Sequence, residues 1–160
     1  MKKFKIFFIL LVPMLIFAGC GGSVKPVCRN ICFNINYQKN NQDYNVFCSV
    51  DSIGNLTATI NSPQEIDGFK VFFSGNTAKT EYLGLAQEGV PGGNFLLNNI
   101  YTVFLNLEKV KLVGKEEMHK AVLEANGQNC TVTITNMGIP IKLEFSEPKM
   151  ELEIKNLTFI

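Results

Sequence analysis

Few side chains in this sequence have the types and spacing that catalysis or metal binding requires. His119 is the single histidine, so a nucleophilic triad or a two-histidine metal site would have to be built around it. It follows Glu116 and Glu117 in a stretch typical of a solvated strand end. Cys28 and Cys32 have the spacing of one arm of a zinc site, but no second arm follows. We therefore expect no catalytic residue, no metal and no cofactor.

The clearest functional signal lies in the first 20 residues. Three lysines stand among the first five residues, an apolar run extends from Ile6 to Ile16, and small residues lead to Cys20. These are the three parts of an export signal. A transmembrane helix needs about 20 apolar residues, and Pro13 interrupts this shorter run. We expect residues 1–19 to be removed.

The segment Leu15–Cys20, with the sequence LIFAGC, resembles the lipobox of bacterial lipoproteins: an apolar residue, two small residues and the modified cysteine. The resemblance implies cleavage between Gly19 and Cys20 and a diacylglyceryl thioether on Cys20. The protein would then be anchored at the extracytoplasmic face of a cell membrane, because two acyl chains hold a protein there without a basic patch. The alternative is an ordinary signal peptide that is cut near Ala18.

Four further cysteines remain: Cys28, Cys32, Cys48 and Cys130. An exported protein can keep disulfides, and four cysteines allow three pairings. Cys48 and Cys130 alternate with valine and isoleucine, as buried strand positions do, which favours free thiols instead. The sequence leaves both alternatives open.

The expected organisation is a signal peptide at 1–19, a lipidated cysteine and tether at 20–27, and a single domain at 28–160. A mature chain of 141 residues suits one hydrophobic core. It keeps 12 basic and 14 acidic residues, a net charge of about −2. Nucleic-acid binding requires clustered Lys and Arg, so we expect no nucleic-acid partner.

Apolar and polar side chains alternate with a period of two, which indicates strands with one buried face. Nine strands are expected, at residues 31–37, 44–50, 56–60, 69–73, 77–82, 121–125, 130–134, 139–145 and 150–154. Residues 84–93 are rich in glycine and contain Pro91, which predicts a loop.

One segment has a different period. Apolar residues recur at steps of three and four at Leu96, Ile100, Val103, Leu107 and Val110, while polar residues occupy the opposite side. This pattern predicts one amphipathic helix over residues 95–110, with Asn94 as its N-cap.

These elements predict an α+β fold, in which an antiparallel, half-barrel-like sheet of about nine strands is covered by one amphipathic helix. An all-β sandwich is the alternative, but it leaves the helical period over residues 96–110 unexplained.

The order of elements resembles that of small lipoproteins related to the LolA/LolB lipoprotein carriers and receptors. The likeness covers most of residues 30–159 and is carried by Asn61-Ser62-Pro63 through Ile66–Phe69, by Tyr82–Leu85 and by Ile141–Phe145. Members are similar in having a half-open barrel whose concave apolar face, lidded by a helix, receives acyl chains. The resemblance implies a membrane-anchored protein that binds lipid.

In that interpretation the ligand lies between the sheet and the helix. The residues that would line the site are Phe69, Val71, Phe73, Ile100, Val103 and Leu107. Phe72 makes the other face of its strand apolar as well, as though the sheet were covered on each side. In the alternative interpretation the same residues form a closed core, and the chain is a surface module that binds another envelope protein. An enzyme is disfavoured by the lack of catalytic groups.

Overall fold

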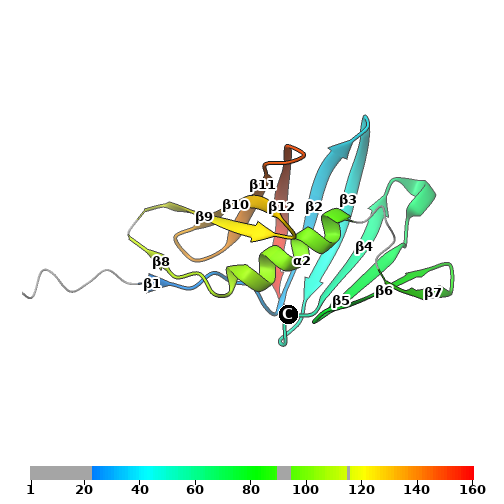
Figure 1. The fold of residues 1–160 in the computed structure, drawn as a ribbon, viewed down its shortest axis with the longest axis horizontal. Helices are drawn as coiled ribbons and strands as arrows, with labels where there is room; N and C mark the ends of the chain where they lie inside the picture. The colour runs from blue at the N-terminus through cyan, green and yellow to red at the C-terminus, as the bar shows by residue number, and fades with distance from the viewer. Residues whose placement is uncertain (1–22, 90–94, 115) are drawn as a thin grey trace, which may run out of the picture.

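A computed structural model describes residues 23–89, 95–114 and 116–160. The export signal, Cys20 and the expected N-cap Asn94 lie outside the described residues. The structure is an antiparallel sheet with one helix across its open side (Figure 1), which confirms the α+β prediction.

Ten strands form the main sheet in the order β7-β6-β5-β4-β3-β2-β12-β11-β10-β9. Their bounds are β2 Ile31–Lys39, β3 Gln42–Val50, β4 Leu56–Ser62, β5 Lys70–Ser74, β6 Thr77–Tyr82, β7 Leu85–Glu88, β9 Met118–Ala125, β10 Gln128–Thr135, β11 Pro140–Phe145 and β12 Met150–Phe159. The sheet is therefore two meanders, β2 to β7 and β9 to β12, which are joined where β12 pairs with β2. The 3-10 turn η1 (Gln64–Ile66) links β4 to β5.

A second, two-stranded sheet pairs β1 (Ser23–Val24) with β8 (Leu112–Val113). The helix α2 (Phe95–Leu107) lies between β7 and β8 in the chain and packs against β9 and β5. It therefore bridges the two arms of the half-open sheet (Figure 1).

The hydrophobic core fills the concave side of the sheet. Alternate residues of the strands are buried there, as the period of two predicts, and α2 contributes its apolar side to the same cluster. The largest fully buried side chains are Phe33, Phe73, Ile31, Ile35, Leu56, Ile100, Leu107, Ile134, Leu143 and Leu152.

The strand β7 lies within the segment that the sequence predicted to be a loop. Tyr82 pairs with Leu85, so Leu83 and Gly84 form a two-residue turn, with φ values of 50° and 79°. Such turns are usually marked by Asn-Gly or Asp-Gly. The Leu-Gly pair does not carry that signal, and all four residues of β7 are exposed, so no alternation reveals the strand.

Ordered contacts begin earlier in the chain, and the helix ends earlier, than the sequence predicted. Ser23 pairs with Val113, and the Val27 amide donates to the Gly138 carbonyl at 2.7 Å, although residues 20–27 were expected to be a tether. The helix ends at Leu107, and the Val110 amide donates to the Leu107 carbonyl at 3.0 Å, an i to i+3 bond in the tighter turn that follows.

Within the described ranges, no helix has both the length and the apolar character needed to span a membrane.

Candidate functional site

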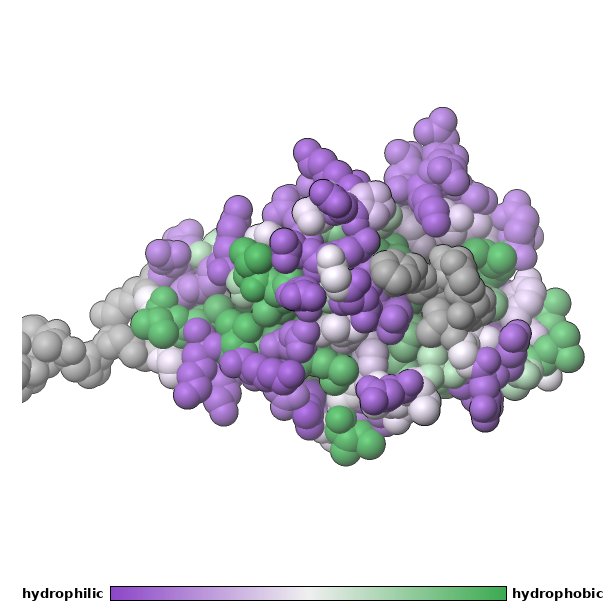
Figure 2. All heavy atoms as spheres, viewed as in Figure 1, coloured by the Kyte–Doolittle hydropathy of each residue, from purple (hydrophilic) through white to green (hydrophobic). Residues whose placement is uncertain are grey.

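One surface depression near the predicted site lies beside β5, β6 and β7. Its lining residues are Phe69, Thr80, Tyr82, Leu85, Ala86 and Gln87, and its volume is about 400 Å³. We call this depression the β7 groove. Figure 2 shows apolar side chains on the surface at this end of the molecule.

Strand register places the groove on the concave face. Val71 pairs with Thr80, and Thr80 pairs with Gln87, so these three residues point to one side of the sheet. Tyr82 and Leu85 form the next pair on that side. The groove therefore continues the same face that forms the buried core at Val71.

The ring of Phe69 forms one wall of the groove. Its centroid lies 5.8 Å from that of Tyr82, with the two ring planes tilted by 50°. The Tyr82 hydroxyl donates to the Glu65 carbonyl at 2.9 Å, and the Thr80 hydroxyl donates to the Gln87 carbonyl at 3.3 Å. Because both hydroxyls are bonded within the protein, these residues offer mainly their ring and methyl surfaces. The side-chain amide of Gln87 is the polar group that remains on the lining.

The structure places the six predicted ligand residues in two environments. Phe69 is half-buried and lines the β7 groove. The other five, Val71, Phe73, Ile100, Val103 and Leu107, belong to the core and are fully buried. The space between sheet and helix is therefore filled by their own side chains. A ligand contact with Ile100, Val103 or Leu107 stays a prediction that requires α2 to move.

Two ring pairs hold α2 over the sheet. Phe104 stacks on Phe33 with the centroids 5.0 Å apart, and Tyr101 stacks on Phe73 at 5.2 Å. The Tyr101 hydroxyl also donates to the carbonyl of Gly75 in the β5–β6 turn, at 3.2 Å. The helix is thus fixed to both the middle and one arm of the sheet.

The polar side of α2 is packed against the β9–β10 hairpin. Asn99 is buried and donates to the Gln128 side chain at 2.7 Å, and it accepts from the Asn126 amide at 2.8 Å. The Asn106 side chain donates to the Glu124 carbonyl at 2.9 Å, which covers part of the β9 edge. Periodicity could show that these side chains are polar, but it could not show that they find partners some 20 to 30 residues away.

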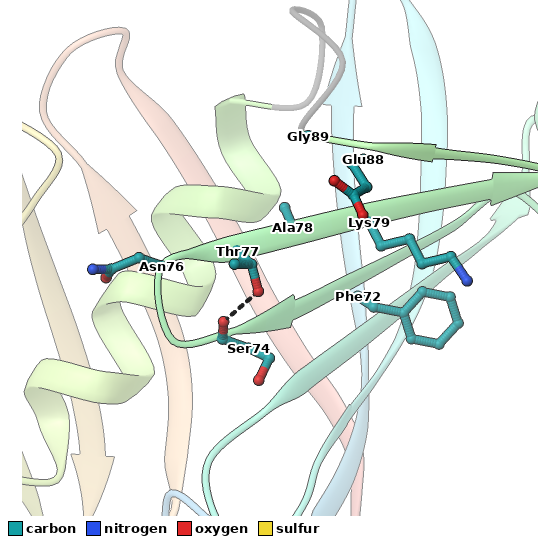
Figure 3. A pocket seen from close by; sticks show the side chains of 8 residues that line it. All are labelled: Phe72, Ser74, Asn76, Thr77, Ala78, Lys79, Glu88 and Gly89. Carbon is teal, nitrogen blue, oxygen red and sulfur yellow. Dashed lines mark hydrogen bonds between the residues drawn. The ribbon is translucent and has the colours of Figure 1, made fainter.

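Two other depressions are less suited to an acyl chain. One has a volume of about 460 Å³ and is lined in part by Phe72, Lys79 and Glu88 (Figure 3). These three residues are paired across β5, β6 and β7, and their side chains face away from the core. Phe72 is half-buried there beside two charged groups, with no second layer on it among the described residues. The other depression, of about 420 Å³, lies between α2 and the β5–β6 turn. The predicted ligand residue Phe73 lines it together with Tyr101 and Leu105, and asparagine and threonine side chains make up much of the rest.

The remaining cysteines are free thiols, so the disulfide alternative is wrong for the structure. Burial raises the pKa of Cys28, Cys48 and Cys130 to about 12 in each case. A thiol that stays protonated is a poor nucleophile and a poor metal ligand. His119 is buried, which corrects the expectation of a solvated histidine. In the part of the chain that the structure describes, no group of three or more His, Cys, Asp or Glu residues gathers as a metal site would.

No protein-family model matches this chain, and no curated protein matches it. Among solved structures, the chain is similar to a LolA superfamily protein from Nitrosomonas europaea, with a TM-score of 0.46 and 8% sequence identity. The match covers 86% of this chain and 89% of that protein.

Proposed function

We propose that this chain is a membrane-anchored, extracytoplasmic lipoprotein that binds an acyl chain or a similar lipid in the β7 groove. The observation that carries the proposal is an apolar groove, open to solvent, on the same sheet face as the core. Phe69, which the sequence assigned to the ligand site, lines this groove.

The size and lining of the groove suit an apolar chain. Its volume of about 400 Å³ lies in the range of small-ligand sites. Each methylene that leaves water contributes about 0.8 kcal/mol, so six methylenes against Phe69, Tyr82 and Leu85 supply roughly 5 kcal/mol before the entropic cost of association. The Gln87 amide is available to a carboxylate or ester group at the end of the chain.

The anchor is supported by the sequence of the N-terminal segment. A short apolar run after three lysines, followed by LIFAGC, predicts export and lipidation of Cys20. Two acyl chains suffice for stable attachment. The intact mass of the membrane-extracted protein checks this assignment, because the mature chain should begin at Cys20 and carry the mass of a diacylglyceryl group.

Native mass spectrometry tests lipid binding. The soluble chain that begins at Gly21, purified without detergent, should carry one lipid molecule per protein or acquire one when a long-chain fatty acid is added. A bare mass under both conditions would remove the lipid-binding proposal.

One observation favours a second candidate function, the binding of an extended peptide along β7. This strand ends the described sheet and is exposed at all four residues. The Gly89 amide bonds to the Ala78 carbonyl at 2.7 Å, so by alternation the amides of Ala86 and Glu88 point to the open edge. Such an edge can add a strand from another protein. Glu88→Pro removes one of these donors at a residue outside the β7 groove lining, and it should weaken or abolish strand addition while leaving fatty-acid binding intact.

A further inference from the structure

The segments at the β1–β8 end of the molecule are held together by specific contacts. Ser23 and Val24 pair with Val113 and Leu112, and the turn between β10 and β11 packs on the residues that follow β1. At Gly138 in that turn, a Cβ atom would meet the Lys25 carbonyl, so the two segments are in direct contact. Figure 1 shows this end opposite the β6–β7 hairpin along the long axis of the molecule.

Three large apolar side chains are exposed at this end: Val113 is 73% exposed, Met137 is 70% exposed and Met118 is 49% exposed. Val113 pairs with Ser23, Met137 precedes Gly138, and Met118 pairs with Thr135 just before the same turn. We call these three residues the anchor-end patch. Figure 2 shows apolar surface at this end among hydrophilic side chains.

The length of the intervening chain limits how far this end can stand from a membrane. Only Gly21 and Gly22 separate Cys20 from Ser23. Three residue steps span at most about 11 Å when fully extended. The headgroup layer on each side of a bilayer is itself several Å thick. A lipid on Cys20 therefore brings Ser23, and the strand pair that contains it, to the membrane surface.

We infer that the anchor-end patch lies in the headgroup layer of the membrane that holds the anchor, so that the domain is docked on the bilayer. This inference rests on the proposed lipidation of Cys20. In the chain segments around the patch, lysines outnumber glutamates: Lys25, Lys111, Lys115 and Lys120 stand against Glu116 and Glu117. Apolar contact therefore acts together with a small net positive charge, which anionic headgroups would attract. The orientation directs the β7 groove away from the membrane surface.

The sequence contains no tryptophan, so a single introduced tryptophan reports its own surroundings. Val113→Trp and Met137→Trp place the probe in the patch, and Lys39→Trp, at an exposed residue at the end of β2 that belongs neither to the patch nor to the β7 groove, is the control. Each variant of the full lipidated protein is reconstituted in phosphatidylcholine vesicles, with and without bromine on the acyl chains. The two patch probes should lose at least about half of their fluorescence to brominated lipid, whereas the control changes little.

The remaining outcomes separate the docking from the anchor. Weak quenching at both patch positions, with the protein sedimenting with the vesicles, overturns the docking and leaves the lipid anchor in place. Protein that stays in the supernatant overturns the anchor and the docking together. Strong quenching of the Lys39→Trp control, equal to that of the patch probes, also overturns the proposed orientation.

Discussion

At the scale of single residues, buried side-chain amides set how firmly the helix is held. Asn99→Ala should destabilise the protein by about 1 to 3 kcal/mol, because it leaves the Gln128 and Asn126 side chains without their buried partner. Asn98→Ala is the matched control on the same turn of α2, since Asn98 is only half-buried. Urea unfolding of both variants measures the difference. Equal losses of stability would contradict the assigned network.

The buried thiol of Cys48 gives a prediction about alkaline pH. Burial raises its pKa from 9.0 to about 12, with a smaller contribution from Cys32. Between these values the unfolded chain loses the thiol proton and the folded chain keeps it. Stability should therefore fall by about 1.4 kcal/mol per pH unit from this group as pH rises from 9 towards 12. Urea unfolding of Cys48→Val should show a shallower decline over this window, and parallel profiles would contradict the assigned burial.

At the scale of elements, the sequence predicted the strands and the helix that have one buried and one exposed face. The nine expected strands each have alternating side chains, and α2 has apolar residues at steps of three and four, so both periods are visible. The missed elements have no such pattern: β7 is wholly exposed, and β1 and β8 have two residues each. Their positions depend on tertiary contacts that involve distant parts of the chain.

One such tertiary contact, between Gly138 and the residues after β1, can be tested. Gly138 has φ +83° and no room for a Cβ atom, whereas Gly127 has φ +80° and nothing within 4 Å of that position. Gly127→Ala should cost about 1 to 2 kcal/mol from backbone strain alone. Gly138→Ala should cost more and displace residues 23–27. Hydrogen exchange at the Val27 amide, which bonds to the Gly138 carbonyl, measures the displacement. Unchanged protection in Gly138→Ala would show that the contact is unimportant.

At the scale of the whole molecule, the proposed account gives the two ends different roles: attachment at β1–β8 and ligand binding at β5–β7. The sequence identified the apolar residues of the candidate site but could not show which of them fill space and which line it. Phe69 and Val71 look alike in the alternation, yet only Phe69 borders the groove. Side-chain pattern predicts which face is buried, whereas an open volume depends on how side chains from separate elements pack.

The most direct measurement of the central claim is a titration of the soluble chain, from Gly21 onward, with a fluorescent fatty acid. Leu85 is 78% exposed on the groove wall, so Leu85→Gln removes apolar contact surface without disturbing the core. Ile53→Gln is the matched control, at a residue that is 71% exposed and outside the groove lining. We predict saturable binding that Leu85→Gln weakens about tenfold, a loss of about 1.4 kcal/mol, and that Ile53→Gln leaves unchanged. Absence of saturable binding, or equal weakening by the two variants, would contradict the account.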